Sequence, residues 1–336
     1  MKRIKSLDLM RVICFAMIVF YHMAVELQKY GLPLRRGAMA LCETPNIHIA
    51  KLSVALFFIL SGVSLTYSQK GKDVSPWKFY RSRFFRILVP YYIVYVVTLV
   101  LLCIAKGGIK YVFAPGIPVS RILVTLFGMD GWIGMHGYAT FNLGIGEWFL
   151  GCLVFFYMLY PWLRMFMQKY PKAFMSAITC LYLAGVFLYR GNVEPHMNAA
   201  MKLFEFCLGM LFGEYAMDAK LRWEKVSIPV FLIFFLCPFE IPLPQAIKIT
   251  IYASACFLSL YRLEAALEKR SCTFLTFMAG ISYEIFLVHH VILYHITVWA
   301  APMLTGAIAV FVCMLLEVLG MIALSLVLHR LTKRKN

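Results

Sequence analysis

Long, uninterrupted runs of apolar residues are the feature that most restricts what this chain can fold into. About ten runs approach the roughly 20 residues that a helix needs to cross a bilayer core. Only 15% of the residues are charged, whereas a soluble domain of this size carries about 25%. Because only lipid can shield so much apolar surface, the sequence predicts an all-α, polytopic membrane helix bundle.

The predicted spans follow these runs and form a single domain over residues 1–336. The first run begins at residue 7 and continues past any plausible cleavage site, so we expect a retained helix rather than a signal peptide. The shortest run lies among four prolines. The expected helices are 7–28, 50–68, 87–105, 146–166, 172–189, 198–217, 226–239, 245–261, 273–295 and 302–328.

Basic residues are distributed unevenly around these predicted spans. With the N-terminus inside, 22 of the 33 lysines and arginines fall at inner termini and loops, and ten fall outside. Cytoplasmic loops of membrane proteins carry such an excess. The pattern predicts a multi-pass protein of the cell (cytoplasmic or inner) membrane with both termini in the cytoplasm. It also accounts for the net charge of +17 without nucleic-acid binding.

The ten cysteines lie almost entirely within predicted helices, and no two of them form a CxxC pair. Their spacing therefore indicates neither a zinc site nor a disulfide framework. We expect them to pack as small apolar residues, and we expect no bound metal.

One connection, residues 106–145 on the predicted outer side, is too long for a plain turn. Its apolar stretch 119–127 is too short to span a bilayer and predicts a re-entrant or interfacial helix. Six glycines follow from Gly128 to Gly146, interleaved with aromatic residues. Such a loop suits contact with sugar rings, and it suits equally a glycine-rich cap over the bundle. Both interpretations remain open.

Three polar side chains share one narrow stripe of the first predicted helix. At 100° per residue, Arg11 lies roughly 20° and Asp8 roughly 40° from His22. Asp8 and Arg11 could form an interfacial ion pair that anchors the helix end, and His22 could donate an interhelical hydrogen bond. Alternatively, His22 in the outer half of the membrane could be a general base, because histidine accepts protons near neutral pH.

Further polar residues lie on the fourth and ninth predicted helices. Ser282 and His289 are seven residues apart and share one helix face, and His290 and His295 extend the cluster. Glu147 stands at the outer end of its helix. There it could orient a histidine, as in catalytic triads, or interact favourably with the helix macrodipole.

Arg81, Arg83 and Arg86 crowd the inner start of the third predicted helix. They could be ordinary positive-inside residues that contact lipid headgroups. The guanidinium fork also matches phosphate oxygens, so these residues could clamp a phosphorylated donor such as coenzyme A.

The sixth predicted helix carries a packing motif. Gly209 and Gly213 have the small-xxx-small spacing at which two membrane helices approach closely. Glu205, one turn earlier, is a candidate for lining a cavity.

Five short motifs occur in order along the chain. They are Ile-x-x-Leu-Asp-x-x-Arg at 4–11 with His22 beyond it, Phe-Phe-Ile-Leu-Ser-Gly at 57–62, the arginine-rich turn at 81–90, Trp-Phe-Leu at 148–150 leading to Tyr-Pro at 160–161, and Ser-Tyr-Glu-Ile-Phe-Leu-Val-His at 282–289. Together they resemble the motifs of the acyltransferase family 3 membrane proteins, which include bacterial polysaccharide O-acetyltransferases. In the last motif, Phe286 replaces the usual tyrosine.

This resemblance implies an integral membrane acyltransferase that takes its acyl group from acyl-CoA on the cytoplasmic side. It implies that His22 is catalytic and that Arg11, Arg81 and Arg83 are required. The residue before Trp148 varies among family forms, so the role of Glu147 is not carried over with the others. No soluble extension follows the last predicted helix, so we expect the stand-alone form of the family.

The expected reaction moves an acyl group, with acetyl the expected one, to a hydroxyl of a cell-surface or exported carbohydrate. Acyl-CoA, with acetyl-CoA the expected form, would be a co-substrate, and no cofactor is expected to be permanently bound. His22 would deprotonate the acceptor, and an acyl-histidine intermediate is an open alternative. The expected site comprises catalytic His22, His289 and Glu147; donor-binding Arg11, Arg81, Arg83 and Arg86; and supporting, oxyanion-stabilising or pore-lining Asp8, Ser61, Trp148, Ser282 and Tyr283.

Two other functions remain open. A transporter or flippase for a glycolipid or organic anion would bind its cargo with the same intramembrane polar groups and perform no chemistry. A sensor or assembly protein would act within the machinery that builds a surface polymer. The expected partners are accordingly membrane lipid, a carbohydrate acceptor, acyl-CoA and such machinery, with no nucleic acid.

Overall fold

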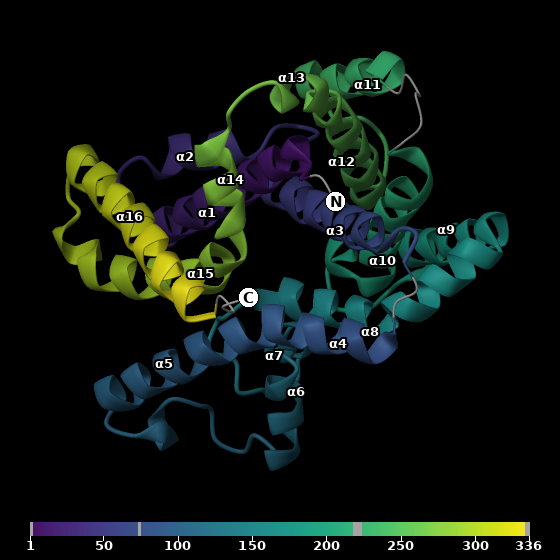
Figure 1. Cartoon of the computed structure of the whole chain (residues 1–336). Helices are drawn as coiled ribbons and strands as arrows, with labels where there is room; N and C mark the ends of the chain where they lie inside the picture. The colour runs from purple at the N-terminus through teal and green to yellow at the C-terminus, as the bar shows by residue number, and fades with distance from the viewer. Residues whose placement is uncertain (1–2, 73–74, 218–223, 333–336) are drawn as a thin grey trace. The chain divides into compact units, whose positions relative to one another are not determined.

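The computed structural model describes residues 3–72, 75–217 and 224–332 (Figure 1). Helices make up 79% of the structure, and the described residues form no strand. Among these residues, eight helices are long and apolar enough to cross a membrane. The prediction of an all-α, polytopic membrane protein is therefore confirmed.

In the described part of the chain, eight long helices follow eight of the ten predicted spans. The predicted spans 198–217 and 226–239 contain only shorter helices, and other short helices occupy the connections. The long ones are α1 (Lys5–Lys29), α3 (Ile49–Gln69), α5 (Val89–Lys106), α8 (Glu147–Lys169), α9 (Pro171–Leu188), α12 (Gln245–Tyr261), α15 (Ser282–Ala300) and α16 (Ala307–Thr332). The shorter ones are α2 (Arg35–Cys42), α4 (Pro76–Arg83), α6 (Ile122–Leu126), α7 (Asp130–Gly134), α10 (Ala199–Leu211), α11 (Glu224–Leu236), α13 (Glu264–Glu268) and α14 (Thr273–Gly280). Two π-helical turns, η1 (Phe84–Leu88) and η5 (Phe212–Ala216), adjoin α5 and α10.

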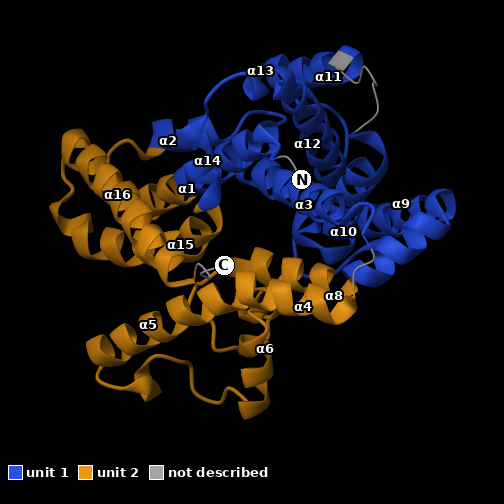
Figure 2. Cartoon of the chain, in the orientation of Figure 1, with its two compact units in different colours: residues 1–21, 36–73, 160–280 blue, residues 22–35, 74–159, 281–336 orange. Residues whose placement is uncertain are grey.

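The chain divides into two compact units, each made of three separate stretches (Figure 2). Unit 1 contains residues 1–21, 36–73 and 160–280, and unit 2 contains residues 22–35, 74–159 and 281–336. Helices α1 and α8 contribute residues to both units. The single domain expected over the whole chain stays a prediction.

One predicted helix is two helices in the structure. The expected continuous helix 273–295 is wrong, because α14 ends at Gly280 and α15 begins at Ser282. Ile281 between them has φ −106° and ψ 6°, outside helical geometry, and glycine has a low helix propensity. Ser282 therefore lies at the start of a helix rather than in its middle.

Orientation in the membrane stays a prediction. The charge count assigns to the inner side six residues that lie outside the described part of the chain: Lys2, Lys220, Arg222, Lys333, Arg334 and Lys335.

The expected short helix over 119–127 is present as the 3-10 turn η3 (Val119–Arg121) followed by α6.

Within unit 1, α3 and α10 pack at unusually short range. A Cβ atom on Gly62 would collide with the Phe206 carbonyl oxygen, and one on Gly209 would collide with that of Ile59. A Cβ atom on Gly213 would lie 2.8 Å from the Val63 carbonyl oxygen. The expected packing face of the sixth helix is therefore confirmed, with α3 as its neighbour.

Unit 1 also buries an ion pair. The Nζ atom of Lys202 lies 3.0 and 2.8 Å from the two carboxylate oxygens of Glu205, and the Thr250 hydroxyl donates to the same carboxylate over 3.0 Å. The side chains of Lys202 and Glu205 are almost completely buried. Glu205 thus has a cation as its partner within the bundle.

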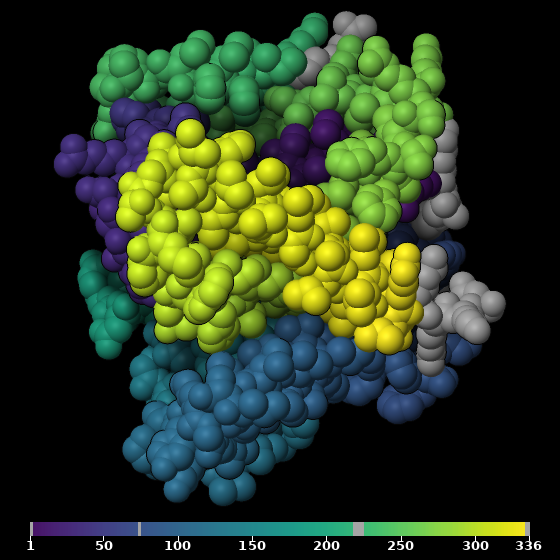
Figure 3. All heavy atoms as spheres, turned by 90° about the vertical axis from the view of Figure 1, so that its left-hand side faces the viewer, coloured from purple at the N-terminus to yellow at the C-terminus, as the bar shows by residue number. Residues whose placement is uncertain are grey.

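Unit 2 is built on α5, α15 and α16. The Tyr283 hydroxyl donates to the Ile87 carbonyl oxygen over 2.9 Å, which ties the start of α15 to the turn before α5. Figure 3 shows α16, in yellow, at the surface, and large apolar side chains such as Ile308, Phe311 and Leu331 are exposed along it. Such a helix face suits contact with lipid.

Residues 107–146 of unit 2, which we predict to lie on the outer side and call the outer segment, contact α5 through Asp130. Its carboxylate accepts hydrogen bonds from the Tyr91 hydroxyl (3.3 Å) and from the Thr125 hydroxyl (3.0 Å). Burial raises the pKa of the Asp130 carboxyl above its usual range, and these hydrogen bonds act in the opposite direction. Through the Tyr91 hydroxyl, Asp130 thus connects α7 of this segment to α5.

Candidate active site

Three side chains from three helices meet within unit 2. His22 lies on α1, Glu147 is the first residue of α8, and His290 lies on α15. The Oε1 atom of Glu147 is 3.3 Å from His22 Nε2 and 2.9 Å from His290 Nε2. All three side chains are partly exposed, His290 the most at 32%. We call these three residues the histidine–carboxylate cluster.

His289 lies beside this cluster, but its ring nitrogens make other contacts than those of His22 and His290. Its ring centroid lies 5.3 Å from that of His22, and its side chain is fully buried. Its Nδ1 atom is 2.7 Å from the Phe286 carbonyl oxygen, which only a protonated Nδ1 can contact as a donor. Its Nε2 atom is buried and has no hydrogen-bond partner among the described residues. His289 thus packs beside His22 and does not contact Glu147 directly.

The backbone at Glu147 is strained, and its neighbours keep it in place. Its φ angle is +44°, a left-handed conformation that costs a residue with a Cβ atom roughly 1–2 kcal/mol. Gly131 of α7 lies so close that a Cβ atom there would collide with the Glu147 backbone carbonyl. Such outliers cluster at functional sites, where the surrounding structure determines them.

The cluster has the parts needed for proton transfer. A carboxylate that accepts the N–H of an imidazole fixes the orientation of that ring and stabilises its protonated form. The unprotonated ring nitrogen then can accept a proton from a hydroxyl group. Glu147 also begins α8, where a negative charge interacts favourably with the helix macrodipole, so both expected interactions are compatible with its position.

Arg11 and Asp8 form the expected ion pair, within unit 1. The Nη1 atom of Arg11 lies 2.9 Å from Asp8 Oδ1, and its Nη2 atom donates to the Ser64 hydroxyl over 2.5 Å. Arg3 contacts the other carboxylate oxygen of Asp8. This geometry supports the anchoring interpretation of the pair, and the expected role of Arg11 in donor binding stays a prediction.

The three arginines near the start of the third span differ in exposure. Arg81 and Arg86 are exposed, whereas Arg83 is half-buried. The Arg83 guanidinium carbon lies 5.7 Å from the Phe79 ring centroid and 6.0 Å from that of Tyr157. Stacking on aromatic rings holds a guanidinium group in a defined orientation. The clamp for a phosphorylated donor stays a prediction.

The remaining expected site residues are dispersed. Ser61 lies on α3 in unit 1, and Trp148 follows Glu147 in α8; both are half-buried. Ser282 and Tyr283 begin α15, seven and six residues before His289, and the Tyr283 hydroxyl donates to Ile87. The structure therefore brings Glu147 together with His22 and with His290, whereas the expected His289 packs beside the His22 ring. Ser282 and Tyr283 lie about two turns before these histidines along α15.

The cluster is also a group that could hold a metal ion. The ligand atoms of His22, Glu147 and His290 all lie within 4.8 Å of one another. Two imidazoles and one carboxylate form a known ligand set for zinc and for non-haem iron. The expectation that no metal is bound stays a prediction.

These observations define a class: a polytopic helical membrane protein with a histidine–carboxylate centre suited to general base catalysis. The chain belongs to acyltransferase family 3, because the model of the family's acyltransferase domain matches residues 4–329, nearly its whole length. The family resemblance seen in the sequence motifs is thereby confirmed. None of the curated proteins and none of the solved structures matches the chain.

Proposed function

We propose that this protein is an O-acyltransferase of the cell membrane. It transfers an acyl group, with acetyl the expected one, from acyl-CoA on the cytoplasmic side to a hydroxyl of a cell-surface or exported carbohydrate. Membership of an acyltransferase family supports the general class, as do the eight helices among the described residues that are long and apolar enough to span a membrane. The observation that carries the proposal is the pair of histidines on one Glu147 oxygen.

In the proposed reaction, the acceptor hydroxyl oxygen attacks the thioester carbonyl carbon while His22 takes the hydroxyl proton. The new C–O bond forms and the C–S bond breaks. The thiolate of coenzyme A leaves and receives the proton from the imidazolium of His22. Glu147 orients the His22 ring and stabilises its positive charge between these two transfers.

His290 and His289 have supporting roles in this proposal. His290 shares the Glu147 oxygen and fixes the carboxylate in a position from which it also contacts His22. His289 packs on the His22 ring and restricts its rotation. A side chain held by several contacts loses little freedom on reaching the transition state, which favours catalysis.

The donor would bind at the arginines that precede α5. Arg81 and Arg86 present exposed guanidinium groups to the pyrophosphate and ribose phosphate of coenzyme A, and Arg83 is held between aromatic rings. The transporter alternative would use intramembrane charges to bind cargo instead. The buried Lys202 already balances Glu205, which removes one of the charges available for that purpose.

Purified protein offered radiolabelled acetyl-CoA and a panel of glycans tests the proposal. We expect label to appear in a glycan and free coenzyme A to be released in equal amount. A transporter or assembly protein leaves every glycan unlabelled. A single-turnover experiment without glycan adds a second result, because label that stays on the protein indicates the acyl-histidine variant.

A further inference from the structure

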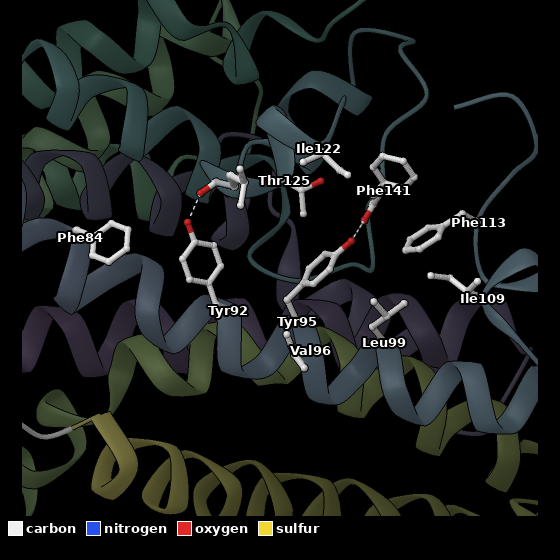
Figure 4. A pocket seen from close by; sticks show the side chains of 11 residues that line it. Phe84, Tyr92, Tyr95, Val96, Leu99, Ile109, Phe113, Ile122, Thr125 and Phe141 are labelled. Atoms are coloured by element: carbon white, nitrogen blue, oxygen red, sulfur yellow. Dashed lines mark hydrogen bonds between the residues drawn. The ribbon is translucent and has the colours of Figure 1, made fainter. Parts of the chain in front are cut away.

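Unit 2 contains a cavity that the proposed acyl transfer does not use. Its volume is about 680 Å³, and it lies between α5 and the outer segment (Figure 4). Tyr95 and Leu99 form part of the α5 wall, and Ile109, Ile122 and Phe141 come from the outer segment. Apart from the Thr125 hydroxyl, the lining side chains are aliphatic or aromatic.

The polar atoms at this cavity are already engaged. The Tyr95 hydroxyl donates to the Phe141 carbonyl oxygen over 2.8 Å, and the Tyr92 hydroxyl donates to that of Leu126. Figure 4 shows both hydroxyl groups directed at the backbone, with the tyrosine rings left against the cavity. A sugar or phosphate placed inside would lose its hydrogen bonds to water without replacement. A hydrocarbon chain forms no hydrogen bonds to water, so it would lose none on entering the cavity.

One wall of the cavity is long enough for an extended chain. It is formed by η1 and α5, and its lining residues run from Phe84 to Leu99, which are 15 residues apart. At ~1.5 Å per residue this is roughly 22 Å, a large part of the ~30 Å bilayer core. This wall therefore has the length and the apolar lining that a single hydrocarbon chain requires.

Cations flank the lining residues of the outer segment. Lys110 follows Ile109 in the sequence, and Arg121 precedes Ile122. Arg121 is held with its guanidinium carbon 4.9 Å from the Tyr138 ring centroid. A chain bound in the cavity would have positive charge near it, which favours a lipid with an anionic headgroup such as a phosphate.

The chain connects the cavity wall to the histidine–carboxylate cluster within six residues. Phe141 lines the cavity, a Cβ atom on Gly144 would lie 3.6 Å from His290 Nδ1, and Glu147 is three residues further on. Six residues span at most about 20 Å. A headgroup whose chain occupies the cavity therefore lies within reach of the proposed catalytic centre.

We infer that the cavity binds the hydrocarbon tail of the acceptor, and that the acceptor is a carbohydrate linked to a lipid through a phosphate. This inference rests on the proposed function and names the class of acceptor. The tail confines the sugar to the neighbourhood of His22, Glu147 and His290, which converts an encounter in solution into one at the membrane surface.

A binding experiment tests the cavity without requiring turnover. The probe is a hexadecyl phosphoglucose with a photoreactive diazirine in its chain, added to the purified full-length protein in detergent. We expect labelled peptides from residues 92–99 and 109–126. Leu99→Trp should reduce this labelling at least fivefold because the indole fills the cavity. The matched control, Leu316→Trp on the exposed face of α16, should leave labelling unchanged.

Undiminished labelling in Leu99→Trp overturns the inference. Val96→Phe provides a second, smaller obstruction if Leu99→Trp lowers the melting temperature. Competition identifies the occupant: unlabelled hexadecyl phosphoglucose should displace the probe at much lower concentration than dioleoyl phosphatidylglycerol. Equal displacement by the phospholipid means that the cavity holds resident membrane lipid and overturns the assignment to the acceptor.

Turnover separates this inference from the proposed function. For Leu99→Trp, the ratio of kcat/KM for hexadecyl phosphoglucose to that for glucose 1-phosphate should fall at least tenfold, whereas Leu316→Trp should keep the wild-type ratio. An unchanged ratio in Leu99→Trp overturns the inference while acyl transfer stands. Specific labelling of the cavity by a protein that acylates no glycan contradicts the proposed function and leaves the lipid site intact.

Discussion

One oxygen of Glu147 contacts an imidazole on either side, and this is the smallest unit on which the proposed chemistry depends. A rotation of the carboxylate that moves this oxygen away would weaken its contacts with both rings. Its backbone conformation, φ +44°, is uncommon for a residue with a side chain. A side chain constrained in this way holds the His22 ring in one orientation, as a general base requires.

His22→Ala should abolish acyl transfer, because it removes the group that takes the acceptor proton. General base catalysis contributes about 10²- to 10⁴-fold, so kcat should fall by at least that factor. Transfer from acetyl-CoA to the glycan is measured alongside expression and melting temperature. The control is His295→Ala on the exposed face of α15, which should keep wild-type activity. Unchanged transfer by His22→Ala would remove the mechanism.

Glu147→Gln keeps the shape of the side chain and removes its charge. As a positioning residue, Glu147 should affect kcat while KM for acyl-CoA stays the same, because the donor contacts other residues. Glu147→Asp should recover part of the lost kcat. A variant that melts at a lower temperature and loses activity in proportion to its unfolded fraction would indicate a purely structural role instead.

Removal of divalent metal should leave transfer unchanged. The proposed chemistry uses proton transfer alone, although His22, Glu147 and His290 are close enough to bind an ion. Prolonged treatment with EDTA and phenanthroline, followed by an activity measurement, checks this expectation. Loss of activity that Zn²⁺ restores would show that the cluster is a metal centre. Metal analysis of the untreated protein by mass spectrometry provides an independent readout.

Single residues of the site differed in how far the sequence could predict them. His22 and Glu147 were accessible because charged and ionisable residues are rare within apolar runs. The choice between His289 and His290 could not be predicted from the sequence. Adjacent residues on a helix differ by 100°, and only packing decides which one faces Glu147. Ser64, which contacts Arg11, resembled any other small residue of its helix.

At the level of helices, the contact between α3 and α10 has the least tolerance for change. The backbone carbonyls of Phe206 and Ile59 occupy the space that side chains on Gly62 and Gly209 would need. Close approach of this kind replaces the hydrophobic effect as the main attraction between helices in lipid.

Gly62→Ala should destabilise unit 1, because one added methyl group forces two backbones apart. Overpacking of this kind costs about 1–3 kcal/mol. Unfolding in detergent micelles, followed by circular dichroism against SDS, measures the change. Gly320→Ala on α16 is the matched control, since nothing lies within 4 Å of a Cβ atom there. Equal stability of the two variants would contradict the close packing of α3 and α10.

The spans themselves were largely predictable, because length and hydropathy alone determine them. The break in the helix at Ile281 was not predictable from the sequence. Residues 273–295 form one apolar run with acceptable helix formers on both sides of Gly280. A hydropathy pattern cannot distinguish a continuous helix from two helices that meet at a residue with φ −106° and ψ 6°, since backbone angles there depend on neighbouring elements.

On the scale of the whole molecule, orientation in the membrane is the prediction with the widest consequences. Alkaline phosphatase fused after Gly71 or at the C-terminus should be inactive, because the positive-inside rule assigns both positions to the cytoplasm. A fusion after Gly191 should be active. Green fluorescent protein at the same positions should give the complementary pattern. An active C-terminal phosphatase fusion would reverse the proposed donor side.

The division into two units could not have been foreseen from the chain. Each unit combines stretches that are far apart in sequence, and α1 and α8 belong to both. Hydropathy reveals individual spans, but it carries no information on which spans pack together. Composition therefore predicted the membrane class, and the grouping of helices required the structure.

The histidine–carboxylate cluster draws one member from α1 and another from α15, near the two ends of the chain. During synthesis, the ribosome must have translated His290, and the membrane must have received the helix that carries it, before the cluster can exist. A nascent or prematurely terminated chain that ends before residue 290 therefore carries His22 and Glu147 without the second imidazole. Under the proposed mechanism, such a chain lacks the contact that fixes the Glu147 carboxylate beside His22.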